Sequence, residues 1–254
     1  MKKWLYLISL SIIWGSSFIL IKKALIGLSP TQLGSLRIIF SSIIIFAFAW
    51  HTLKIITKNE WKWIIISAFL GSFFPAFLFA FAETEIDSSI ASVLNSLVPL
   101  NTVIIGAIVF KIASSKKQII GVIIGFIGTY LLIEKGIELN PDQNYLYSGL
   151  VILCSFLYGF NVNIIKKYLN EVPPVAIAAG HFSVIFIPAI IIFLLSDFKS
   201  EQIHDPDTIK SIGYVLVLSA FGTALAKVLF NKLVQMSTAV FASSVTYSLL
   251  IVSS

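Results

Sequence analysis

Eight long apolar stretches follow one another along the chain, with short polar segments between them. Each stretch is close to the roughly 20 residues that a helix needs to cross the hydrocarbon core of a bilayer. The stretches are apolar on nearly every side and do not alternate as barrel strands do, so they predict transmembrane helices and an all-α integral membrane fold. A ninth stretch begins near Ala239 and runs toward Ser254. The eight cover residues 4–21, 33–50, 61–82, 90–110, 119–133, 145–165, 175–195 and 212–229.

The fifth stretch is short, and small residues recur in its segment GVIIGFIGTY at intervals of three and four positions. Small residues at this spacing let neighbouring helix backbones approach closely within a membrane. We therefore expect the helix at 119–133 to be buried among its neighbours.

The composition agrees with lipid as the main solvent of the chain. Of the 254 residues, 57% are hydrophobic and 12% are charged, whereas about 25% of an ordinary soluble domain is charged. The net charge of +6 comes from lysines in the short gaps and not from a basic stripe with interleaved aromatic residues, so no nucleic-acid partner is predicted. Cys154 is the only cysteine and no metal-ligand spacing occurs, so we expect no disulfide, metal or cofactor.

The lysines of the loops predict the orientation of the chain. With the amino terminus inside the cell, eleven lysines fall in inside loops and five in outside loops. This excess satisfies the positive-inside rule and predicts a cytoplasmic amino terminus. Ten of the twelve acidic residues then fall outside, in agreement. The opening segment has a charged start but no cleavage pattern before Lys22, so we interpret it as an uncleaved first helix and not a signal peptide.

The second half of the chain repeats the first. At an offset of 144 residues, WGSSFILIKKAL from Trp14 aligns with YGFNVNIIKKYL from Tyr158, and Arg37 aligns with His181. At an offset of about 152, ISAF in the third stretch aligns with LSAF in the eighth, and at 151 ASVLNSLVP aligns with ASSVTYSLL. A unit of five helices is odd in number, so the second unit must enter the membrane from the opposite face, as in the inverted repeats of carriers.

The chain resembles the EamA-like family of the drug/metabolite transporter superfamily over its whole length. The resemblance rests on WGSSF in the first helix, the segment from Pro30 to Arg37, ASVLNSLVPL in the fourth helix, the glycine-rich fifth helix, and FGTALAKVLFN in the eighth. It implies a ten-helix inverted-repeat (5+5) permease of the cell inner (cytoplasmic) membrane, with both termini cytoplasmic. It also implies a central cavity lined mostly by helices 1, 3, 4, 6, 8 and 9, and often the export of amino acids or other metabolites.

We therefore predict two EamA-like repeats, at residues 1–135 and 145–254. The second holds helices 6–9 only, so we expect the sequence to be truncated and a tenth helix to follow Ser254. Two departures from the family pattern leave the substrate open. Leu250 stands where a proline is expected, and Lys227 stands where an aromatic residue is common.

Two cations and one histidine lie within predicted helices. An ionisable group at membrane depth costs at least about 2.5 to 3.5 kcal/mol on insertion scales, so it usually faces a cavity or a partner. Arg37 and Lys227 each have two interpretations. Either the long side chain reaches the membrane interface, or it faces the cavity, where Arg37 would orient substrate carboxylates and Lys227 would bind an anion. His181 is either a hydrogen-bonded packing residue or a functional one.

Uncharged polar and aromatic residues that the repeat makes equivalent are the other cavity candidates. They pair Trp14 with Tyr158, Ser17 with Asn161, and Asn95 with Thr246. Pro99 lies four residues after Asn95 and lacks an N–H, which frees a backbone carbonyl nearby. Hydrogen bonds between helices, of about 0.6 kcal/mol each, are the other role open to these residues. The predicted substrate-cavity set is Trp14, Ser17, Asn95, Pro99, Tyr158, Asn161, Lys227 and Thr246, with Arg37 and His181 as further charge or orientation residues.

The leading functional hypothesis is alternating-access transport of a small metabolite, an amino acid or a related compound, by an exporter. The alternative is a flippase for a lipid-linked substrate, in which Lys227 would bind the head group. An intramembrane enzyme is disfavoured because no Ser/His/Asp set or HExxH spacing occurs, and no catalytic residue is predicted. No carboxylate lies in mid-helix, which favours uniport or coupling through another group. The expected partners are a small-molecule substrate and the lipid bilayer, and a homodimer is compatible with the sequence.

Overall fold

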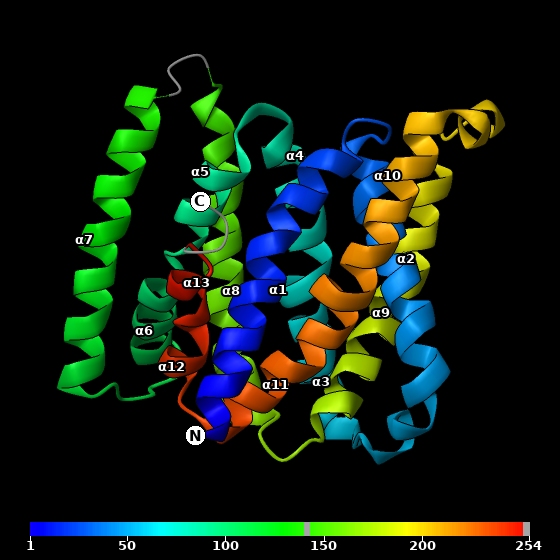
Figure 1. Cartoon of the computed structure of the whole chain (residues 1–254). Helices are drawn as coiled ribbons and strands as arrows, with labels where there is room; N and C mark the ends of the chain where they lie inside the picture. Colours follow the sequence, from blue (N-terminus) through cyan, green and yellow to red (C-terminus); the bar gives the residue numbers. More distant parts are fainter. Residues whose placement is uncertain (140–142, 251–254) are drawn as a thin grey trace.

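The computed structural model describes residues 1–139 and 143–250, and every regular element in that part of the chain is helical (Figure 1). Eight helical segments in it are long and apolar enough to cross a membrane. They coincide with the eight predicted stretches, so the all-α membrane fold is confirmed. The segments are Lys2–Ala24, Pro30–Ile55, Lys58–Glu85, Ser88–Ile108, Lys116–Lys135, Tyr145–Tyr168, Pro174–Leu194 and Pro206–Met236.

Several of these segments are built from more than one helix. In chain order the elements are α1 (Lys2–Ala24), α2 (Pro30–Ala49), η1 (Trp50–Ile55), α3 (Lys58–Ala68), η2 (Phe69–Phe73), α4 (Phe74–Glu85), α5 (Ser88–Asn95), α6 (Val98–Ile108), α7 (Lys116–Leu139), η3 (Tyr145–Tyr147), α8 (Ser148–Tyr168), α9 (Pro174–Leu194), η4 (Ser200–His204), α10 (Pro206–Val217), η5 (Leu218–Leu225), α11 (Ala226–Met236), α12 (Ala239–Ser243) and α13 (Val245–Ser248).

Two membrane segments contain a π-helical turn between two α-helices. η2 joins α3 to α4, and η5 joins α10 to α11. Turns of this kind within α-helices often lie at functional sites. The fourth segment is interrupted in another way, because Pro99 in the first turn of α6 has no N–H to bond the preceding turn, and α5 ends at Asn95.

Helices from the two halves of the chain pack directly against each other. α2 packs along α9, α6 packs along α8, and α1 contacts both α10 and α11. The hydrophobic clusters between them mix residues of both halves, as where Leu10, Ile165 and Leu233 share one cluster. In lipid, van der Waals packing of this kind holds helices together, since acyl chains are as apolar as the side chains. The two halves therefore form one helical body.

The fifth membrane segment, α7, lies at the edge of this body (Figure 1). Only 11% of the apolar 18-residue stretch of this segment is buried. The expectation that this helix is buried among its neighbours is wrong. Gly121 and Gly128 face open space, and Gly125 alone of these three packs on a neighbour, the ring of Tyr247. Apolar side chains such as that of Ile124 point outward, which costs little where lipid is the solvent.

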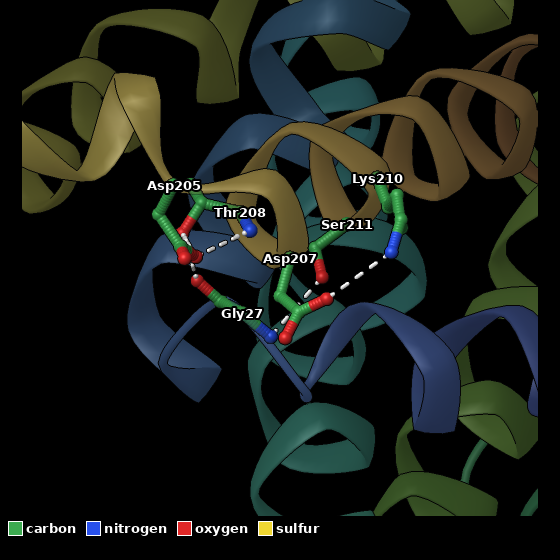
Figure 2. A network of polar contacts seen from close by, with 6 residues as sticks. All are labelled: Gly27, Asp205, Asp207, Thr208, Lys210 and Ser211. Carbon is green, nitrogen blue, oxygen red and sulfur yellow. Dashed lines mark hydrogen bonds and ion pairs between the residues drawn. The ribbon is translucent and has the colours of Figure 1, made fainter.

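Figure 2 shows the polar network that fastens the loop after α1 to the start of α10. The carboxylate of Asp205 accepts the N–H of Thr208 at 2.8 Å and so caps α10. The Thr208 hydroxyl lies 3.0 Å from the Gly27 carbonyl, and the Gly27 N–H donates to Ser211 Oγ at 3.1 Å. A Cβ at Gly27 would lie 2.5 Å from the main-chain oxygen of Asp207. Glycine is therefore required where the loop meets α10.

Candidate functional site

A central cavity lies between the two halves of the chain. Its empty space is about 970 Å³ when the open solvent at its mouth is counted as well. Its walls come from α1, α2, η2, α4, α5 and α6 of the first half and from α8, α9, η5, α11, α12 and α13 of the second. These elements include the expected helices 1, 3, 4, 6, 8 and 9. Helices 2 and 7 also contribute, through α2 and α9.

Most of the predicted cavity residues lie on this wall. The cavity is lined by Trp14, Ser17, Asn95, Tyr158, Asn161, Lys227 and Thr246, and also by Arg37. Six of them form the three pairs that the repeat makes equivalent, so equivalent positions of the two halves meet at one cavity. Their contact with a substrate stays a prediction.

Two of these side chains are held by hydrogen bonds that cross between the halves. The indole Nε1 of Trp14 donates to the main-chain carbonyl of Gly222, 3.0 Å away in η5. The amide oxygen of Asn161 accepts the hydroxyl of Ser67 at 2.5 Å, and Asn161 is 1% exposed. Both groups therefore have a fixed orientation at the wall, as interhelical hydrogen bonds provide.

Asn95 lies on the wall with its side-chain oxygen buried, and its side chain makes no hydrogen bond to the described part of the chain. The hydroxyl of Ser17 donates to the Ile13 carbonyl at 2.8 Å, and that of Thr246 donates to the Ser243 carbonyl at 3.0 Å. A buried polar atom without a partner costs about 1 to 3 kcal/mol. Asn95 therefore carries a hydrogen-bonding group that no described residue uses.

Arg37 on α2 points to the cavity and not to the end of its helix. Its Nε donates to Thr223 Oγ1 at 2.8 Å, and its main-chain carbonyl accepts the Ser41 hydroxyl at 2.7 Å. Within residues 1–139 and 143–250, no hydrogen-bond acceptor or carboxylate is bound to its two terminal amino groups. The interpretation that Arg37 reaches the membrane interface is therefore wrong.

Lys227 on α11 is also directed inward, and it is 7% exposed. Its Nζ donates to the main-chain carbonyl of Gly71 in η2 at 2.9 Å. A Cβ at Gly71 would lie 2.3 Å from the Asn161 side chain, so a glycine is needed for η2 to approach the wall this closely. No carboxylate in the described part of the chain lies within ion-pair distance of Lys227. The interface-reaching interpretation is wrong here as well.

The two cations are anchored by the two π-helical turns in a reciprocal way. Arg37 of the first half bonds to Thr223 in η5 of the second half. Lys227 of the second half bonds to Gly71 in η2 of the first half. Gly71 and Thr223 are equivalent at the offset of 152 residues that aligns ISAF with LSAF. The repeat thus supplies matching anchors for two positive charges.

Two predicted residues lie behind the wall. Pro99 is buried in the first turn of α6, and its neighbour Val98 lines the cavity. His181 on α9 is 0% exposed, and neither of its ring nitrogens has a hydrogen-bond partner among the residues described. Its neighbour Phe182 lines the cavity. At both positions the rotation of the helix, which hydropathy does not specify, presents the adjacent side chain.

Sequence reasoning missed Gly71 and Thr223 in the cavity wall, and it did not predict the burial of Glu83. Gly71 and Thr223 act through the π-helical turns, and the ISAF and LSAF alignment was the one signal that these turns are equivalent. Glu83 is 0% exposed although it lies near the end of α4, and its Oε2 accepts the Ser88 hydroxyl at 2.8 Å. Lys22 donates to the main-chain carbonyl of Glu83 at 2.8 Å. Glu83 does not line the cavity.

The model of the EamA-like transporter family matches residues 1–134 and 146–254 of this chain. An uncharacterized transporter of Archaeoglobus fulgidus is 26% identical over 225 residues, which cover 88% of this chain and 77% of that protein. A probable amino-acid metabolite efflux pump of Salmonella typhimurium is 26% identical over 211 residues, which cover 82% of this chain and 68% of the pump.

A protein of known crystal structure has the same fold. It superposes with a TM-score of 0.71, covering 99% of this chain and 85% of the other, at 14% sequence identity. The likeness concerns the arrangement of the helices alone.

Proposed function

This chain belongs to the EamA-like transporter family, and from that premise we propose that it exports an amino acid or a related small metabolite across the cell inner (cytoplasmic) membrane. As a family member it is a multi-pass membrane transporter and not an enzyme. The name of the Salmonella typhimurium relative supports both the substrate class and the outward direction. The excess of lysines in alternate loops supports a cytoplasmic amino terminus.

The proposed mechanism is alternating access by two inverted repeats, residues 1–135 and 145–254, which move against each other about the central cavity. Three observations support this division. α1 and α8, which begin the two repeats, run in opposite directions across the bundle (Figure 1). The π-helical turns η2 and η5 fall at equivalent positions. The family model also matches in two blocks, one that ends at residue 134 and one that begins at residue 146.

The observation that carries the proposal is that equivalent residues of the two halves line one cavity. Trp14 and Tyr158 offer aromatic surfaces, while Ser17, Asn161, Asn95 and Thr246 offer polar groups. A concave site with mostly apolar walls and a few polar groups is the usual form of a small-molecule site. Movement of one half relative to the other would change the access to such a site from each side of the membrane.

The test is counterflow in liposomes that contain the purified carrier. Liposomes are loaded with one unlabelled solute from a panel of amino acids, their deaminated and acylated derivatives, and their amides, and uptake of the labelled solute is followed. Protein-free liposomes give the passive leak. We expect counterflow for at least one amino acid or derivative. A carrier that is inserted and folded, yet exchanges no solute of the panel above the leak, would refute the proposal.

A further inference from the structure

Arg37 and Lys227 place two positive charges on one stretch of the cavity wall. The guanidinium of Arg37 is held at Thr223, and Lys227 follows Thr223 by four residues in the same helical segment. Side chains four residues apart in a helix are about one turn apart and lie on the same face. Both cations therefore lie on neighbouring parts of the cavity wall.

The two cations on the wall have no carboxylate in contact with them among the residues that the structure describes. Among the residues that the structure describes, no lining residue carries a carboxylate, and neither cation forms an ion pair. Glu83 does not line the cavity, and Lys22 is bound to its main chain. Two unpaired cations in a site of low dielectric constant repel each other strongly. A bound anion would remove this repulsion.

The hydrogen-bond donors of both cations are also incompletely used. Lys227 has three N–H donors and one acceptor among the described residues, the carbonyl of Gly71. Arg37 has five N–H donors, and Thr223 accepts only the one at Nε. The remaining donors match the oxygens of an acidic group, which form short, charge-assisted bonds with such cations.

The same wall disfavours a free ammonium group. A zwitterionic amino acid would bring a third positive charge to a cavity whose described lining offers no carboxylate to receive it. An acid whose amino group is absent, replaced by a carbonyl oxygen or acylated avoids that cost. Much of the remaining lining is apolar or aromatic, with Phe18, Phe79, Phe182 and Phe230 among its residues, so it suits a hydrophobic body.

We propose that the solute is an organic anion, a carboxylic acid with an apolar body and no free amino group, whose carboxylate binds between Arg37 and Lys227. This inference rests on the proposed function, since it names the substrate class of the same cavity. In this arrangement each half of the carrier supplies one cation to the head group, so a bound anion would connect the two moving parts.

The first experiment compares solutes that share a skeleton and differ in charge. 4-Methyl-2-oxopentanoate, leucine and leucinamide are tested in counterflow, and phenylpyruvate is tested against phenylalanine. We expect each oxo acid to have a half-saturation concentration roughly tenfold below that of its amino acid, equivalent to about 1.4 kcal/mol, and leucinamide to be the poorest solute. Preference for leucine, phenylalanine or leucinamide overturns the anion inference while leaving transport intact. Absence of counterflow for the whole wider panel overturns the proposed function instead.

The second experiment uses variants of the two cations. Lys227→Gln and Arg37→Gln should each raise the half-saturation concentration for 4-methyl-2-oxopentanoate roughly tenfold, since each removes one charge-assisted contact. Lys232→Gln is the matched control, because Lys232 is an exposed lysine on the same helix and does not line the cavity. Unchanged half-saturation in both cation variants refutes the inference. If either variant fails to fold, the charge preference of the unmodified carrier decides the question alone.

Discussion

Trp14 of α1 and Gly222 of η5 are joined by a hydrogen bond of 3.0 Å from the indole Nε1 to the main-chain carbonyl. The indole ring also packs on Phe230, with ring centroids 5.2 Å apart. A Cβ at Gly222 would lie 2.6 Å from Ser17 Oγ, so glycine allows α1 to approach the π-helical turn. This contact connects the first helix of one half to the irregular turn of the other at the cavity wall.

Replacing Trp14 by phenylalanine should lower transport while the protein still inserts. The substitution keeps an aromatic ring but removes the N–H that bonds Gly222. Loss of this hydrogen bond should cost about 0.5 to 1.5 kcal/mol, which corresponds to a roughly two- to tenfold lower initial rate of counterflow. Counterflow of the best solute measures the effect. Trp4→Phe is the control, since Trp4 is 54% exposed and lies outside the cavity. Equal rates in the two variants would exclude Trp14 from the site.

Asn95 and Asn163 should respond to leucine substitution in opposite ways. Asn95 lines the cavity without a hydrogen bond to the described residues, so Asn95→Leu should reduce transport without lowering thermal stability. Asn163 is away from the cavity, and its Nδ2 donates to the carbonyls of Thr102 and Gly159 at 3.0 and 2.8 Å. Asn163→Leu should therefore destabilise the fold by about 1 to 3 kcal/mol. Thermal unfolding in detergent and counterflow separate the two effects; a stability loss in Asn95→Leu would contradict this assignment.

Lys23 and Lys167 are equivalent at the offset of 144 residues and end the first helix of each proposed repeat. An inverted repeat places them on opposite faces of the membrane. Both side chains are exposed, and the native Cys154 is buried, so single cysteines at the two positions can be labelled selectively. A membrane-impermeant maleimide applied to intact cells should label Lys23→Cys and leave Lys167→Cys unlabelled until the cells are permeabilised. Labelling of both from the same side would refute the inverted arrangement.

Gly27→Val should destabilise the carrier without touching the cavity. The new side chain would collide with the main chain of Asp207 and Thr208, because a Cβ added at Gly27 would lie 2.5 Å from the Asp207 oxygen and 2.6 Å from the Thr208 nitrogen. Overpacking of this kind costs about 1 to 3 kcal/mol. Gly149→Val is a suitable control because no atom lies within 4 Å of its added Cβ. The melting temperatures of the two variants in detergent should differ by several degrees, and equal values would contradict the close packing of this loop.

The cap of α10 should make part of the stability depend on pH. The N–H of Thr208 and then its hydroxyl lower the pKa of the Asp205 carboxyl below its ordinary value of 3.8. A group whose pKa is lower in the folded state stabilises the fold above the unfolded-state pKa, and this contribution disappears as the pH falls through the folded-state pKa. The melting temperature of Asp205→Ala should therefore lie furthest below that of the unmodified carrier near pH 7, and the gap should narrow in acid.

Asp207→Ala is the control for this pH series. Asp207 is 59% exposed and pairs with Lys210 at 3.4 Å, a surface contact of the kind that contributes little. Its removal should leave the melting temperature nearly unchanged from neutral pH to acid. A gap of the same size at every pH for Asp205→Ala would show that its carboxylate does not cap α10.

The membrane segments and the pairs of cavity residues could be predicted from the sequence because both depend on local or repeated features. Transfer of a segment to lipid depends on the summed polarity of its own residues. The predicted ranges of the eight helices therefore agree with the observed ones to within a few residues at most of their ends. The repeat brought Trp14 and Tyr158 together as candidates, because equivalent positions in two similar units face the same axis.

Only the tertiary structure decided where long or rotatable groups point. Arg37 and Lys227 have side chains that reach either an interface or a cavity from the same backbone, and the π-helical turns that anchor them depend on packing between halves. The rotation of α6 and α9 put Val98 and Phe182 on the wall in place of Pro99 and His181. α7 stayed exposed because small residues permit close packing but require a neighbouring helix to provide it. Polarity along the chain thus determined what enters the membrane, and contacts between distant segments determined what faces the cavity.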